Sequence, residues 1–253
     1  APKTWEELRT VGAKIADRAA QRWGFCVPHP DPYHEFPLMS AGGAYVFGNN
    51  PDGTLNPDDI GLNTKGGVQG MQLLKALIDD GIMPLGVDSN ATTTLFKEGK
   101  VGMVIAGPWV LEDVRKAGVD YGIAKIPLID GKRPRPFVGV QGFMISAFSR
   151  NKMLAKAFLD EYVITQGTML ALFEKGARPP VYIPALNAVK DADAIAFYEI
   201  ASEGVPMPSI PEMNNVWTAW SNAIELILNG KLPPQQALDE AVAQIRLAIS
   251  QSR

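Results

Sequence analysis

The sequence predicts an α/β fold, and two kinds of segment carry that prediction. Apolar residues recur at helical spacing in several stretches, most clearly over 233–250, where five of them form one stripe. Short apolar runs bounded by glycine or proline, such as 25–27 and 101–106, are typical of buried strands. Strands that alternate with helices favour the α/β class. A chain of 253 residues is long enough for one large domain or two smaller ones.

In the first half, helix-start residues and glycines define the expected elements. Thr4 is expected to cap a helix that runs to Gly24, and Thr64 to begin a helix that ends before Gly81 at the C′ position. The prolines of 28–33 predict a loop, and 49–57 a surface turn. A short helix over 91–96 is expected to start from Ser89 or Asn90, followed by the 101–106 strand.

In the second half, Trp109 is expected at the start of a helix, directly after the strand 101–106. Ligands gather at the carboxyl ends of strands in open α/β sheets. Further strands are predicted over 121–126 and 143–147. Further helices are predicted from Ser149 to 162, with Leu154, Ala157 and Phe158 inward, and over 168–175, 193–202, 211–228 and 233–250.

Composition excludes several classes of function. The net charge is −3 and no cluster of Lys and Arg stands out, so a basic footprint for nucleic acid is absent. No apolar run reaches the 18 residues that a spanning helix needs. A single cysteine, Cys26, excludes an internal disulfide and a multi-cysteine zinc site.

Catalytic and metal motifs give weak signals. The turn 61–67 resembles a phosphate-binding loop but lacks its lysine, so a helix start is the better interpretation. His29, Asp31 and His34 are close enough in sequence for a metal site, although a loop is the more common meaning of such a cluster. Asp31 and Glu35 could form the carboxylate pair of a glycoside hydrolase. Cys26 lies between apolar residues, which favours a buried thiol over a nucleophile.

Aromatic residues next to prolines give the more informative signal. Tyr33 and Trp109 each follow a proline, and Trp217 follows the proline-rich loop 206–211. An aromatic ring that stacks on the CH face of a pyranose is worth about 1–3 kcal/mol. Three such rings, each directly after a proline or a proline-rich loop, therefore favour sugar binding without a catalytic group.

Four spaced motifs resemble the maltose/maltodextrin-binding family, the extracellular solute receptors of ABC importers. They are PKTWEEL over 2–8, FKEGKVGM with GPW over 96–109, PFVGV over 136–140, and MPSIPEM with a following tryptophan over 207–217. The resemblance runs along the whole chain. It implies a periplasmic-binding-protein-like type II fold, of which this chain is essentially the C-terminal lobe plus a crossover piece of the N-terminal lobe. Residues 1–138 and 193–253 are expected in the C-terminal lobe, and 139–192 in the crossover piece.

The resemblance also implies the ligand site. By it Tyr33, Trp109 and Trp217 stack on sugar, Met207 lines the pocket, and Asp31 accepts sugar hydroxyls where relatives often have Glu. Further departures from the family pattern are His34 in place of an aromatic residue, and Thr218 and Ser221 in place of a tyrosine and an arginine. The expected ligand is a maltose-type oligosaccharide, with trehalose or sucrose as alternatives on the same scaffold.

The expected protein is a non-enzyme without cofactor or metal. Its expected partners are the missing N-terminal lobe, on the same or a separate chain, and the membrane permease of an ABC importer. The expected location is periplasmic or extracellular, with lipid anchoring of a full-length precursor as one form.

Overall fold

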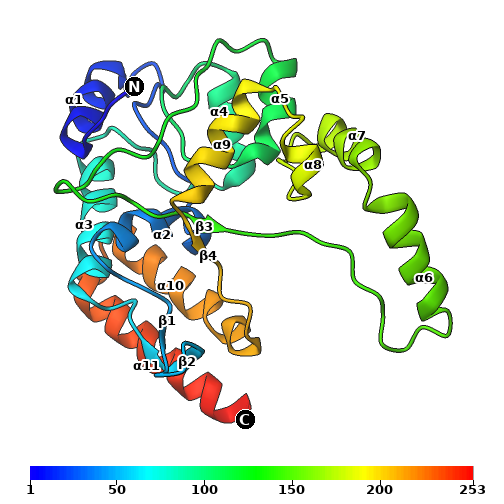
Figure 1. Cartoon of the computed structure of the whole chain (residues 1–253). Coiled ribbons are helices and arrows are strands. Elements are labelled where there is room, and N and C mark those ends of the chain that lie inside the picture. The colour runs from blue at the N-terminus through cyan, green and yellow to red at the C-terminus, as the bar shows by residue number, and fades with distance from the viewer. Residues whose placement is uncertain (253) are drawn as a thin grey trace. The chain divides into compact units, whose positions relative to one another are not determined.

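A computed structural model describes residues 1–252 and divides the chain into two compact units (Figure 1). Unit 1 comprises Ala1–Ile105, Lys125–Val138 and the chain from Glu203 onward, and unit 2 comprises Ala106–Ala124 and Gly139–Ser202. The division at Val138 falls where the sequence analysis places the start of the crossover piece. Residues 106–124 and 193–202, which it places in the C-terminal lobe, instead group with 139–192. The assignment of the units to lobes remains a prediction.

Unit 1 is built mainly of helices. They are α1 (Trp5–Ile15), α2 (Pro32–Ala41), α3 (Lys65–Asp79), α4 (Ser89–Lys97), the 3₁₀ helix η3 (Pro211–Asn215), α10 (Trp217–Leu228) and α11 (Pro234–Ser252). Two small sheets accompany them: β1 (Phe47–Asn49) pairs antiparallel with β2 (Leu55–Ile60), and β3 (Phe137–Val138) pairs parallel with β4 (Val205–Pro206). The predicted cap Thr4 is confirmed, since its side chain accepts the Glu7 N–H. Helix α3 starts where the sequence predicts a helix, and Thr64 caps it by accepting the Gly67 N–H. Helix α1 ends at Ile15, well before the predicted Gly24.

The core of unit 1 lies where α2, α3, α10 and α11 pack together. Close packing of α2 on α3 depends on glycine, because a Cβ at Gly70 would lie 2.7 Å from the backbone nitrogen of Met39. Phe36 of α2 stacks on Phe137 of β3 at a centroid distance of 3.9 Å, and Trp220 of α10 meets both rings edge-on. The predicted stripe of α11 is confirmed as buried, which joins the C-terminal helix to this core (Ala237, Leu238, Ala241, Ile245 and Ile249).

The strands predicted for 25–27 and 101–106 form only isolated bridges. Cys26 pairs parallel with Val104, and its N–H donates to the Met103 carbonyl at 2.8 Å. On the other side Gly24 donates to the Ile82 carbonyl at 2.9 Å. The segment 23–26 therefore lies between two neighbours in a short, irregular arrangement, and the expectation of continuous strands was wrong. No strand forms over 121–126 in the described chain either.

Unit 2 has seven short elements and few buried side chains. They are the 3₁₀ helix η1 (Pro108–Val110), α5 (Leu111–Lys116), α6 (Lys152–Phe158), the π-helical turn η2 (Leu159–Val163), α7 (Gln166–Gly176), α8 (Ile183–Leu186) and α9 (Ala192–Ser202). Arg115 of α5 holds α9, donating to both Asp191 oxygens at 2.8 and 2.9 Å and to Asp193 at 2.5 Å. The predicted helix over 193–202 is confirmed.

Two predictions within unit 2 were wrong. The described chain has no strand over 143–147, where Phe143 and Met144 are exposed and no neighbouring strand offers hydrogen bonds. In α6 the side chains of Leu154 and Phe158, expected inward, are also exposed. The helix starts from Asn151 rather than Ser149.

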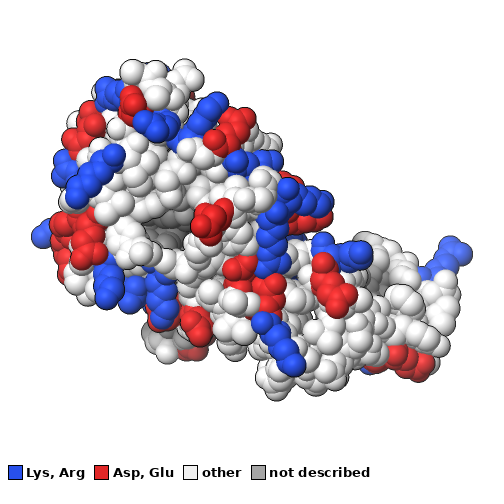
Figure 2. Space-filling view, turned by 90° about the horizontal axis from the view of Figure 1, so that it is seen from above, with Lys and Arg blue, Asp and Glu red and all other residues white. Residues whose placement is uncertain are grey.

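The charged surface is mixed. Figure 2 shows Lys and Arg interleaved with Asp and Glu on the face in view, without a broad basic patch. None of the described helices is long and apolar enough to cross a membrane.

Candidate functional site

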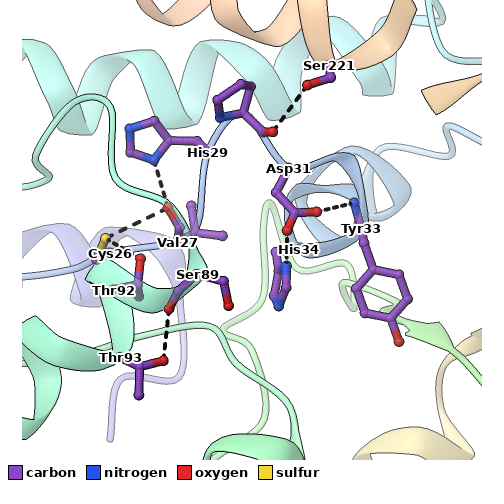
Figure 3. Close-up of polar contacts among 11 residues, drawn as sticks. Cys26, Val27, His29, Asp31, Tyr33, His34, Ser89, Thr92, Thr93 and Ser221 are labelled. Carbon is purple, nitrogen blue, oxygen red and sulfur yellow. Dashed lines mark hydrogen bonds and ion pairs between the residues drawn. The ribbon is translucent and has the colours of Figure 1, made fainter. Parts of the chain in front are cut away.

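Asp31 organises the loop before α2 through two hydrogen bonds (Figure 3). Asp31 is the N-cap of α2, with Pro32 at the first helical position, where its missing N–H costs nothing. One carboxylate oxygen accepts the Tyr33 N–H at 3.0 Å, and the other accepts from His34 Nδ1 at 2.7 Å. Burial raises the pKa of Asp31, but the hydrogen bonds from His34 and the backbone outweigh it and hold the pKa below its ordinary value. The side chain is therefore an ionised acceptor at neutral pH.

His29, in the same loop, is occupied on both sides of its ring. Nδ1 donates to the Val27 carbonyl at 2.7 Å, and Nε2 accepts the Gly86 N–H at 2.8 Å. Burial lowers the pKa of His29, so the ring is neutral at pH 7. With both nitrogens used, His29 cannot join Asp31 and His34 around a metal ion. No group of three or more His, Cys, Asp or Glu within residues 1–252 is placed to hold one.

A cavity of about 520 Å³ opens beside this loop. Its size lies within the range of about 300–1,000 Å³ that is common for small-molecule sites. Trp217 lies partly exposed at the cavity, with its ring parallel to that of buried Trp220 at 6.4 Å. The Ser221 hydroxyl ties α10 to the loop by donating to the Pro30 carbonyl at 3.2 Å. The lining combines this aromatic wall with a polar rim (Pro28, His29, Pro30, Asp31, Pro32, Asp88, Ser89, Trp217, Thr218, Ser221 and Asn222).

Glu35 is fully buried on α2 and is absent from the cavity lining. Neither of its carboxyl oxygens has a hydrogen-bond partner among the described residues. Burial, together with the charge of Asp31, raises the pKa of Glu35 well above its ordinary value. A neutral group that a substrate cannot reach does not suit a catalytic pair with Asp31.

The buried thiol predicted for Cys26 is confirmed. The side chain is inaccessible, and Sγ lies 3.4 Å from Thr92 Oγ1. Burial raises the pKa of the thiol to about 11 against the opposing hydrogen bond with Thr92. A thiol that keeps its proton at neutral pH is a poor nucleophile.

Half of the eight predicted site residues line this cavity: Asp31, Trp217, Thr218 and Ser221. Tyr33 and His34 lie next to Asp31 on α2, and the Tyr33 hydroxyl donates to the Phe137 carbonyl at 3.4 Å. Met207 packs partly buried against the core after β4. Trp109 belongs to unit 2, where its ring lies so close to Gly107 that a Cβ there would clash at 2.1 Å.

Sequence reasoning missed three polar residues of the rim. Asn222 is four residues beyond Thr218 on α10, so the helical period could have indicated that the two share a face. Asp88 is the N-cap of α4, accepting the Ala91 N–H at 2.8 Å, where Ser89 or Asn90 was expected. Ser89 consequently becomes the first residue of the helix and lines the cavity.

Loss of the Asp31 cap is expected to destabilise unit 1. Asp31→Ala should lower the free energy of unfolding by about 1–2 kcal/mol, because the first turn of α2 loses its acceptor. Asp31→Asn keeps a capping oxygen and should lose less than half as much. Urea denaturation of the three proteins measures this, and equal losses in both variants would contradict the capping role.

An aromatic wall and a polar rim around one cavity are typical of small-molecule sites. A family model described as "Bacterial extracellular solute-binding protein" matches residues 1–200, and the chain belongs to that family. The family is non-enzymatic, so the hydrolase hypothesis for Asp31 and Glu35 was wrong.

Two curated relatives come from Bacillus subtilis (strain 168). The galactooligosaccharide-binding protein is 36% identical over 248 residues, which cover 95% of this chain and 58% of the relative. The maltodextrin-binding protein MdxE is 30% identical over 262 residues, covering 97% and 61%. A solved cyclo/maltodextrin-binding protein complexed with maltotetraose superposes with a TM-score of 0.87 at 34% identity, covering 98% of this chain and 65% of that one. The chain therefore spans about 60% of the length of these relatives.

Proposed function

We propose that this chain is the larger part of a sugar receptor that delivers an oligosaccharide of hexoses to an ABC importer. The observation that carries the proposal is the cavity of unit 1, where the half-buried ring of Trp217 lies beside ionised and hydroxyl-bearing side chains. The names of the relatives, which bind galactooligosaccharide or maltodextrin, support the same ligand class.

The chemistry of the cavity suits a pyranose. The CH face of the sugar can pack on an indole, while each hydroxyl that leaves water needs a hydrogen-bond partner. Asp31 offers carboxylate lone pairs, and Thr218 and Ser221 offer hydroxyl groups at the same cavity. We extend the proposal to Tyr33, His34 and Met207 of unit 1 and to Trp109 of unit 2 as ligand contacts, on the basis of the family motifs that contain or flank them.

Removing the aromatic wall is expected to weaken binding. Trp217→Ala should reduce sugar affinity by about 1–3 kcal/mol, because the stacked apolar area is lost. NMR titration of the 253-residue chain with maltotetraose measures the change. Trp23→Phe is the matched control, since Trp23 lies outside the cavity lining and its replacement should leave affinity unchanged. Unaltered affinity in a folded Trp217→Ala protein would refute the stacking assignment.

The ligand class is tested by calorimetry or NMR with a panel of sugars. Maltotetraose and a galactotetraose represent the relatives' ligands, and trehalose and sucrose represent the alternatives on this scaffold. Saturable binding of either tetrasaccharide, stronger than that of both disaccharides, would support an oligosaccharide receptor. Absence of binding to every sugar in the panel would overturn the proposal.

The same proposal covers the lobes to which the two units belong, the cellular location of the receptor and its membrane partner. Unit 1 would form most of the C-terminal lobe, and residues 139–192 of unit 2 would belong to an N-terminal lobe completed by residues outside this sequence. The receptor would work outside the cytoplasmic membrane, in the periplasm or at the cell surface. Its partner would be the importer's membrane permease.

A further inference from the structure

The polar rim of the cavity contains hydrogen-bonding groups that the fold leaves unused. One carboxylate oxygen of Asp88 caps α4, and the other has no hydrogen bond to a described residue. Ser89 accepts from Thr93 through its backbone carbonyl, while its hydroxyl is unused within residues 1–252. The side-chain amide of Asn222, on α10, has no hydrogen bond to the described chain either. All three residues line the cavity.

These three groups come from two elements and offer complementary chemistry. Asp88 supplies an acceptor oxygen, Ser89 a hydroxyl that donates and accepts, and Asn222 an amide with both functions. None of the three is aromatic, so they cannot hold a sugar by its face. They can instead hold it by the hydroxyl groups at its edge.

Trp217 and the three rim residues therefore contact different parts of a sugar. Stacking on Trp217 depends on the apolar CH face of the ring, whereas an edge contact depends on where each hydroxyl points. Asp88 and Asn222 are exposed and Ser89 is half-buried, so a bound sugar would take water from them. A sugar without a hydroxyl at the matching place is disfavoured, because polar groups that lose water on binding then stay unpaired. Galactose and glucose differ only in the configuration of one ring hydroxyl.

We propose that Asp88, Ser89 and Asn222 hold one hexose edge-on and determine whether the receptor prefers a galacto- or a gluco-configured sugar. The proposal rests on the sugar-binding function proposed above and names the residues that set its specificity. Trp217 supplies affinity that both kinds of sugar share. The three rim residues supply the difference in affinity between the two kinds of sugar.

The test compares affinity ratios. The 253-residue chain is titrated with galactotetraose and with maltotetraose, followed by NMR, as wild type and as Asp88→Asn, Ser89→Ala and Asn222→Ala. Asp88→Asn keeps a capping oxygen but removes the charge and replaces one acceptor oxygen with an amide donor. We expect a preference of at least fivefold in the wild type that falls toward unity in these variants. Trp217→Ala should weaken both sugars by the same factor and keep the ratio.

Asn90→Ala is the matched control, because Asn90 adjoins Ser89 on α4 but does not line the cavity. It should change neither affinity nor ratio, and circular dichroism checks the fold of each variant. A wild-type ratio near one, or a ratio that survives all three rim substitutions, would overturn the inference. If the wild type binds neither sugar, it is the proposed function that fails.

Discussion

Glu35→Met is expected to stabilise unit 1 by about 1–3 kcal/mol at pH 7, since that is the usual cost of a buried polar group without a partner. The Glu35 side chain is fully buried, and neither carboxyl oxygen has a partner in the described chain. Methionine fills a similar volume without a polar atom that needs hydration. Most core substitutions destabilise a protein, so a gain here would be diagnostic.

The effect of Glu35 should also depend on pH. In the folded chain burial raises its pKa well above the ordinary 4.5, so the carboxyl keeps its proton where the unfolded chain releases it. The native state then binds more protons than the unfolded state, and stability falls as pH rises from about 4.5 through the folded pKa. The slope reaches at most about 1.4 kcal/mol per pH unit. Glu35→Gln, which cannot ionise, should abolish this contribution.

Urea denaturation between pH 5 and 8 measures this slope. Four of the five tryptophans, Trp5, Trp23, Trp217 and Trp220, lie in unit 1, so fluorescence reports mainly its unfolding. The variant must be compared with wild type at each pH, because buried His29 has a lowered pKa and contributes the opposite slope below 6.5. Glu225→Gln, on the exposed side of α10, is the control. A Glu35→Gln protein with the wild-type pH dependence would refute the neutral carboxyl.

The features that sequence predicted well depend on neighbours within a few residues. The helix starts at Thr4 and Thr64 could be predicted because a side-chain oxygen at each satisfies an N–H only three residues away. The buried face of α11 followed from the helical period alone. Such local interactions are visible in a short window of sequence.

The features that sequence missed depend on residues far apart in the chain. The strand predicted for 143–147 has suitable apolar residues, but a strand forms only where a partner supplies hydrogen bonds. The cavity joins the loop 28–32 to the start of α4 and to α10, and no local pattern pairs Asp88 with Asn222. Glu35 has the sequence spacing of a catalytic partner for Asp31, yet packing places it in the core.

Unit 2 exposes a larger apolar surface than a folded unit of its size usually leaves uncovered. Met144 and Phe148 are 95% and 96% exposed, and many apolar side chains on and around the following helices are exposed as well. These exposed apolar side chains all lie between residues 140 and 183 (Val140, Phe143, Met144, Phe148, Met153, Leu154, Phe158, Tyr162, Ile164, Leu172, Val181 and Ile183). The chain spans about 60% of the length of its relatives, so we propose that the part of the relatives that it does not span covers this surface.

Extending the chain to the full length of its relatives is therefore expected to raise sugar affinity about a thousandfold. On unit 1 alone, a sugar keeps many hydroxyls in water, and we expect binding near 1 mM, about −4 kcal/mol. A second lobe that closes on the ligand would supply partners for those hydroxyls and bring affinity to about 1 µM, near −8 kcal/mol. Calorimetry of both proteins with the same tetrasaccharide measures the gain.

Binding of a hydrophobic dye and size-exclusion chromatography test the apolar surface in the same two proteins. The 253-residue chain should bind the dye and self-associate through the uncovered segment, and the extended chain should do neither. Phe148→Ser with Met144→Ser should reduce self-association of the shorter chain without changing its sugar affinity, because neither residue lines the unit 1 cavity. Micromolar binding by a monomer of the shorter chain would refute the claim that a second lobe supplies most of the affinity, since unit 1 would then hold the sugar by itself.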